Sequence, residues 1–171
     1  MKTTLEDIKK LVDAFAKKIN APERSLPTYG TSADGAHPHI EIDKTGQLSY
    51  VIVERGEELE RHFAADTDDL LYRVFADVTF EMAISFEGNH RIEGEDFRRQ
   101  LFAKQEELLV MLRNEWRERK QKEHDWVLRS HPFDDEASRR AGYSKQLSDA
   151  GMPAAEAWAE ALKKYPEPKP G

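Results

Sequence analysis

Three short segments between residues 39 and 63 alternate apolar and polar side chains. They are HIEID, QLSYVIVE and ELERHF, and the links between them, KTG and RG, each contain a glycine. Alternation with a period of two is typical of strands that bury one face, and short links with glycine are typical of hairpins. We therefore predict a short three-stranded antiparallel meander in this part of the chain.

Apolar residues at helical spacing precede and follow the predicted meander. The first predicted helix starts at Thr3, which has capping-box spacing with Glu6. Its apolar stripe is Leu5, Ile8, Val12, Phe15 and Ile19. A second helix is predicted from about Thr67, with the stripe Leu70, Leu71, Val74, Phe75, Val78 and Met82. A third is predicted to start near Asp96 and to continue as one helix past Trp126 until Pro132 stops it.

These elements predict an α+β fold for residues 1–136, in which the N-terminal helix and the two longer helices pack on the antiparallel meander. Residues 20–38 contain three prolines and two glycines, so we expect an irregular loop there. Residues 137–171 are predicted to form a C-terminal helical extension, with one short helix at 154–164 and a flexible proline-rich end.

The composition narrows the classes of function. The chain has no cysteine and a net charge of -7, and residues 1–90 carry 10 basic against 17 acidic side chains. An acidic surface repels phosphate backbones, so we do not expect nucleic-acid binding. The N-terminus has acids where a signal peptide needs an apolar core, and no apolar run approaches the ~20 residues of a membrane span. A soluble cytoplasmic protein is expected.

Motifs of catalysis, cofactor binding and metal binding are missing from the sequence. There is no GxxxxGK[ST] or GxGxxG loop, no GxSxG elbow and no HExxH pair. His37 and His39 could share one strand face, but they lack a third ligand at a recognisable spacing. We therefore expect no catalytic, cofactor or metal residue. Two alternatives remain open: a small-molecule hydrolase that uses surface carboxylates and His39, and an adaptor or scaffold that uses the long predicted helix.

Seven acidic residues gather in the turn before the third predicted strand, in that strand and just after it: Glu54, Glu57, Glu58, Glu60, Asp66, Asp68 and Asp69. Like charges at this density lower stability, so binding of a basic partner is one reasonable use for them. Charged edge strands also prevent aggregation, which is the alternative explanation.

A second polar feature lies in the third predicted helix. Arg98 and Gln105 fall in the same angular sector as Leu112 and Trp116, where a core-facing side should be apolar. A buried guanidinium needs a partner, so Arg98 is expected to pair with a carboxylate, with Asp96, Glu54 and Glu41 as candidates. We interpret Asp96 and Arg98 as structural.

The sequence also resembles a known family, immunity protein 63 of bacterial polymorphic toxin systems. The resemblance covers about residues 4–136. It is carried by KKINAPERSLPTYGTSADGAHPHIEID, YVIVERGEELERH, TDDLLYRVFADVTFEMA and RIEGEDFRRQLFAKQEELL, and it ends near RSHPFDDE.

The resemblance implies a protein that binds a cognate toxin domain by stoichiometric occlusion and catalyses nothing. It implies no cofactor and does not name the toxin. Aromatic residues often anchor such interfaces, so Tyr29, Tyr50 and Tyr72 are candidates by residue type. Each of them also suits core or edge packing.

Overall fold

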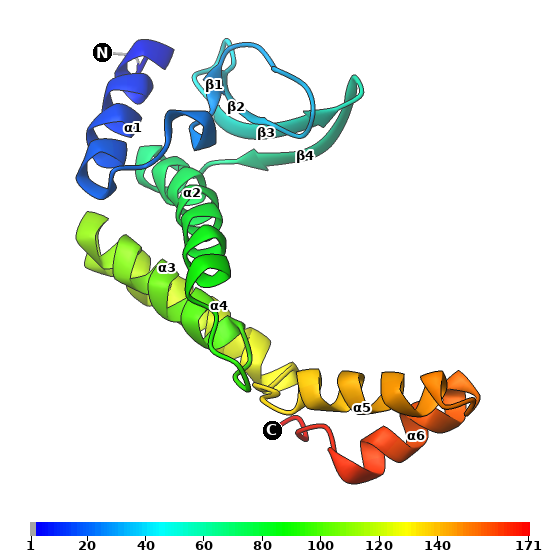
Figure 1. Cartoon of the computed structure of the whole chain (residues 1–171). Helices are drawn as coiled ribbons and strands as arrows, with labels where there is room; N and C mark the ends of the chain where they lie inside the picture. The colour runs from blue at the N-terminus through cyan, green and yellow to red at the C-terminus, as the bar shows by residue number, and fades with distance from the viewer. Residues whose placement is uncertain (1–2) are drawn as a thin grey trace. The chain divides into compact units, whose positions relative to one another are not determined.

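The computed structural model describes residues 3–171 and shows an α+β protein (Figure 1). The chain forms two compact units. The first unit consists of Met1–Met82 and Gln105–Glu118, and the second of Ala83–Lys104 and Arg119–Gly171. The helices α2 (Thr67–His90), α3 (Arg98–Leu112) and α4 (Asn114–Ser130) each contribute residues to both units.

The sheet has four strands in the order β1-β2-β3-β4, so the predicted three-stranded antiparallel meander was incomplete. The strands β2 (Pro38–Ile42), β3 (Leu48–Glu54) and β4 (Glu57–Phe63) are antiparallel neighbours, as predicted. The additional strand β1 (Thr28–Tyr29) pairs in parallel with β2, which makes the sheet mixed. Two residues are too few to show a period of two, so β1 was hidden in the predicted loop, which also holds a short 3-10 helix, Glu23–Ser25.

The core of the first unit lies between one face of the sheet and the helices. Ile40 and Tyr50 from the strands pack with Ile8 of α1 (Leu5–Ile19) and with Phe75 of α2. The indole of Trp116 stacks on the ring of Phe75 at 6.0 Å between centroids, and it is almost completely buried. The apolar stripes predicted for the first two helices therefore face this core, as hydrophobic periodicity requires.

The N-terminal cap of α1 is one residue later than predicted. The side chain of Thr4 accepts a hydrogen bond from the amide of Asp7 at 3.2 Å, and the amide of Thr4 donates to the Asp7 carboxylate at 3.0 Å. This capping box replaces the predicted pair of Thr3 and Glu6. Both pairs have the required spacing, so the sequence alone did not distinguish them.

The single long helix predicted from Asp96 was wrong, because the structure has two helices, α3 and α4, with a break at Arg113. The rings of Phe102 in α3 and His124 in α4 stack at 3.9 Å between centroids. In one continuous helix these residues would be about 33 Å apart, so the chain reverses direction. No glycine or proline marks the reversal, so sequence rules for helix ends did not detect it.

The C-terminal residues form two helices where one was predicted. The predicted helix is α6 (Ala154–Lys164), and α5 (Ala137–Asp149) was missed. The two helices pack on each other, and the rings of Tyr143 and Tyr165 meet edge to face at 6.0 Å. The residue of α5 that is buried is an arginine, Arg140, so an apolar stripe was not available to reveal this helix. The domain border near residue 136 remains a prediction.

Candidate functional site

The hairpin of β3 and β4 presents two carboxylates that face each other across its end. Arg55 and Gly56 both have positive φ, 54° and 79°, and make the tight connection between the strands. This turn places Glu54 directly opposite Glu57 in the ladder. Both side chains are exposed, and within residues 3–171 neither carboxylate has a hydrogen-bonding or ion-pairing partner. Like charges directly opposite each other destabilise a strand pair.

The next two glutamates of β4 are neutralised by arginines. The guanidinium of Arg61 donates to both carboxylate oxygens of Glu58, at 2.9 and 2.7 Å, and this lowers the pKa of Glu58 below its ordinary value. Arg73 of α2 donates to Glu60 at 2.8 Å. Glu58 and Glu60 therefore carry less free charge than the sequence suggested.

The three aspartates at the start of α2 also have partners inside the first unit. Asp66 accepts a hydrogen bond from the amide of Asp69 at 2.9 Å, as expected at a helix N-terminus. The carboxylate of Asp69 lies 3.0 Å from His62. Asp68 accepts from the indole of Trp116 at 3.2 Å and lies 3.3 Å from Arg113. The seven predicted contact residues are thus near one another, but Glu54 and Glu57 are the two with free carboxylates.

His39 lies on the other face of the sheet, next to Glu41. Its Nε2 is 2.8 Å from Glu41, which also accepts a hydrogen bond from Arg61 at 2.7 Å. These contacts, that of Arg61 first, lower the pKa of Glu41. His39 is 2% exposed, and a nearby surface hollow is lined by Glu41, Arg61 and Phe63 without His39. No geometry in the described part of the chain therefore supports His39 as a catalytic base that touches a substrate.

Among residues 3–171, no group of three or more histidine, aspartate or glutamate side chains is arranged to hold a metal ion. Helices long and apolar enough to span a membrane are absent from this part of the chain.

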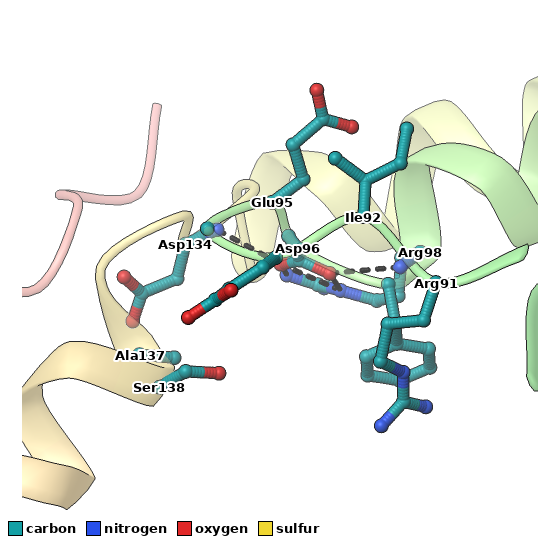
Figure 2. A pocket seen from close by; sticks show the side chains of 11 residues that line it. Arg91, Ile92, Glu95, Asp96, Arg98, Asp134, Ala137 and Ser138 are labelled. Carbon is teal, nitrogen blue, oxygen red and sulfur yellow. Dashed lines mark hydrogen bonds and ion pairs between the residues drawn. The ribbon is translucent and has the colours of Figure 1, made fainter.

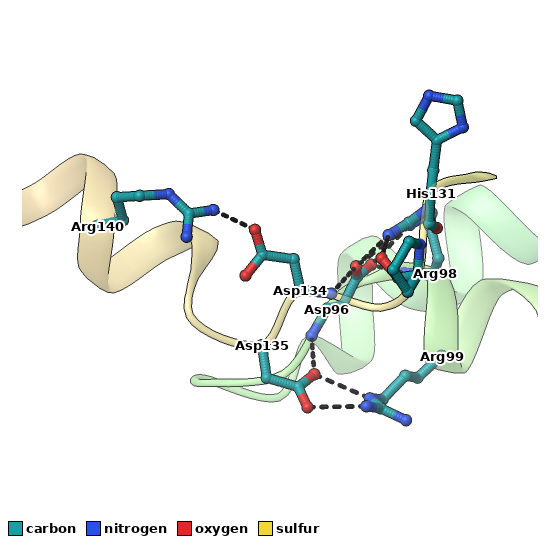
Figure 3. A network of polar contacts seen from close by, with 8 residues as sticks. Asp96, Arg98, Arg99, His131, Asp134, Asp135 and Arg140 are labelled. Carbon is teal, nitrogen blue, oxygen red and sulfur yellow. Dashed lines mark hydrogen bonds and ion pairs between the residues drawn. The ribbon is translucent and has the colours of Figure 1, made fainter. Parts of the chain in front are cut away.

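In the second unit, Asp96 is the centre of a buried polar network (Figures 2 and 3). Its carboxylate accepts from the guanidinium of Arg98 at 2.6 Å, from the amide of Arg98 at 2.9 Å and from the amide of Asp134 at 2.8 Å. Arg98 also donates to the carbonyls of His131 and Pro132, both at 2.8 Å. Of the three partners considered for Arg98, the structure selects Asp96.

The acidity of Asp96 reflects two opposing effects. Burial on its own raises the pKa of this carboxyl group, but the hydrogen bonds from Arg98 and from the Asp134 amide outweigh it. The pKa of Asp96 is therefore below its ordinary value, and the pKa of Arg98 is raised by the same pair. Both groups stay charged near neutral pH.

Four further side chains extend this network, and the sequence did not reveal them: Arg99, Asp134, Asp135 and Arg140. Asp135 accepts from the amide of Asp96 and, in a bidentate pair, from Arg99, each at 2.8 Å. Arg140 donates to Asp134 (Figure 3), and it also donates to the carbonyl of Tyr165 at 2.8 Å. The network ties the loop before α3 to the segment before α5 and to the end of α6. The contacts that join the loop before α3 to the segment before α5 span 36 to 39 residues, so no local spacing could predict them.

A surface hollow beside this network is lined in part by charged side chains that already have partners. Figure 2 shows Arg91, Asp96, Arg98 and Asp134 around it, whereas Glu95 points away. Arg91 pairs with Glu87 at 2.8 Å. Arg91, Asp96, Arg98 and Asp134 are therefore held by other groups of the protein.

Comparison with protein families gives one match. Residues 44–126 match the family described as immunity protein 63. These residues belong to the immunity protein 63 family. No curated protein and no solved structure matches the chain. The resemblance predicted from the sequence is thus confirmed over this segment.

The immunity protein 63 segment includes most of the features described above. It covers β3, β4, α2, α3 and most of α4. The acidic hairpin and the pair of Asp96 and Arg98 lie inside it, whereas Asp134, Asp135 and Arg140 lie outside. The polar network therefore joins the family segment to the C-terminal helices.

The network should make this protein sensitive to acid. Hydrogen bonds from Arg99, followed by that from the Asp96 amide, lower the pKa of Asp135 to about 2. A carboxyl group whose pKa is lowered by folding stabilises the protein above its unfolded pKa of about 3.9, and this contribution is lost as the pH falls through the folded value. We expect the free energy of unfolding to fall between about pH 4 and pH 2, measured by urea denaturation. The Asp135→Asn variant should show a shallower fall, and parallel curves would contradict this assignment.

Proposed function

We propose that this protein is an immunity protein that binds a cognate toxin domain of a bacterial polymorphic toxin system and neutralises it by stoichiometric occlusion. Membership of residues 44–126 in the immunity protein 63 family is the observation that carries this proposal. We propose further that it acts in the cytoplasm, without catalysis and without a cofactor.

The proposed contact surface is the acidic part of the first unit. The seven acidic residues Glu54, Glu57, Glu58, Glu60, Asp66, Asp68 and Asp69 are its members. Glu54 and Glu57 come first among them, because their carboxylates are exposed and unpaired whereas the other five are held by neighbouring groups. Opposite potentials accelerate association, so a toxin domain with a basic surface fits this arrangement.

Neutralisation in cells tests this proposal. A toxin reading frame adjacent to the gene should kill a host when expressed alone and should be harmless when both proteins are made. Occlusion predicts that protection increases with the molar ratio of the two proteins up to one to one, and that the purified pair forms a stable complex. Protection at a small fraction of the toxin concentration would instead indicate a catalytic mechanism. Absence of both protection and complex would overturn the proposal.

A further inference from the structure

β4 is an outer strand of the sheet, and among residues 3–171 no other strand pairs with its second edge (Figure 1). The opposite outer strand, β1, has two residues, whereas β4 has seven. A free edge presents unpaired amide and carbonyl groups, which can pair with an extended segment of another chain. β4 is therefore the longer of the two edges available for such pairing.

The register identifies the backbone groups that point away from the sheet. The amide of Ala64 donates to the carbonyl of Leu48 at 3.0 Å, so Ala64 faces β3. Antiparallel ladders alternate between inward and outward residues, which places the backbone groups of Arg61 and Phe63 outward. Within the described chain, nothing donates to or accepts from these outward groups.

The side chains along this edge are suited to a partner. Phe63 is 63% exposed and Leu59 is 58% exposed, although both are apolar. Leu59 sits where the ladder shifts register, opposite Ile52 and Val53, so it is the additional residue of a bulge. Bulges and charges can protect an edge from aggregation, but large exposed apolar side chains on the same edge counteract that protection. Their exposure favours an edge that is covered in a complex.

The charges of β4 select the kind of partner. The strand contains three glutamates and one arginine, and Glu57 is its first residue, next to the turn from β3. If β4 paired with a second copy of itself, it would bring acidic strands together, and like charges directly opposite are destabilising. A basic segment would instead meet opposite charge, including the two unpaired carboxylates of Glu54 and Glu57.

We infer that the toxin domain adds an extended, basic segment to the free edge of β4 as a fifth strand, with apolar side chains packed on Leu59 and Phe63. This inference rests on the proposed function and specifies how the two proteins would meet. Backbone pairing would supply affinity and the glutamates would supply selectivity.

Amide exchange in the complex with the adjacent toxin domain tests this inference. The amides of Arg61 and Phe63 should exchange at least tenfold more slowly in the complex than in the free protein. The Phe63→Lys variant should weaken binding by at least tenfold, because it replaces an apolar contact and adds a positive charge facing a basic segment. Phe63 is exposed, so this variant should remain folded. A matched control is Met111→Lys, which makes the same charge change at an exposed apolar residue of α3 and should alter affinity less than threefold.

The outcomes separate the inference from the function on which it rests. A neutralising complex in which Arg61 and Phe63 exchange freely and Phe63→Lys binds normally would overturn the inference and leave the function intact. Protection of these amides in the isolated protein that increases with its concentration would identify a second copy as the occupant, and would also overturn it. Absence of any complex would remove both proposals.

Discussion

Reversing the charges of Glu54 and Glu57 together, in a Glu54→Lys and Glu57→Lys variant, is expected to slow association with the toxin domain by at least about tenfold at low salt. These carboxylates are exposed and unpaired, so their field is available to a basic partner. The association rate of the natural protein should fall as salt is added, whereas that of the variant should change much less. Stopped-flow measurements at several salt concentrations would show both effects.

The double charge reversal should change the association rate without changing the stability of the protein. The two positions face each other, so the variant keeps a like-charged pair and should unfold at nearly the same denaturant concentration. A control with Glu23→Lys and Glu81→Lys changes the net charge equally at exposed positions outside the hairpin. An equal loss of rate in both variants would show that total charge steers the encounter. An unchanged rate in the hairpin variant would remove this surface from consideration.

Replacing Asp96 by asparagine is expected to lower the free energy of unfolding by about 3 kcal/mol or more. The substitution keeps the shape of the side chain but removes the charge that faces Arg98. The Arg98 side chain is 19% exposed, so its guanidinium would remain largely buried without an anion. Urea denaturation followed by circular dichroism would measure the loss.

Glu95 provides the matched control for Asp96. Glu95→Gln makes the same chemical change at the adjacent, exposed position, whose side chain points away from the network (Figure 2). This substitution should change the free energy of unfolding by no more than about 0.5 kcal/mol. Equal losses for the two variants would show that the buried pair does not stabilise the second unit. Toxin binding by folded Asp96→Asn should be unchanged, because we interpret this residue as structural.

The candidate site was only partly predictable. The concentration of acidic residues around β4 is a property of the sequence, and so is the short turn that places Glu54 opposite Glu57. The sequence does not show which carboxylates remain unpaired. Arg73 neutralises Glu60 and Arg113 neutralises Asp68, and both arginines come from other parts of the chain. The sequence therefore does not rank the seven residues, whereas the structure shows which carboxylates are paired.

The same distinction applies to the polar network. The need of Arg98 for a carboxylate followed from its position on an apolar helix face. The contributions of Asp134 and Asp135 did not follow from any local pattern, because their contacts with Asp96 and Arg99 span 38 and 36 positions. That of Arg140 did not either, because its contact with the Tyr165 carbonyl spans 25 positions. Amphipathic periodicity also failed for α5, in which an arginine takes the buried position.

By itself, the sequence determined the elements with a strong local pattern: the helices α1, α2 and α6, the strands β2, β3 and β4, and the family segment. Only the tertiary structure decided that β1 joins the sheet, that the chain reverses at Arg113 and which acids remain unpaired. The physical reason is that the periodicity of apolar residues shows only which side of a single helix or strand is apolar. The reversal at Arg113 depends instead on contacts between elements, such as Phe102 on His124 and Arg98 on the carbonyls of His131 and Pro132.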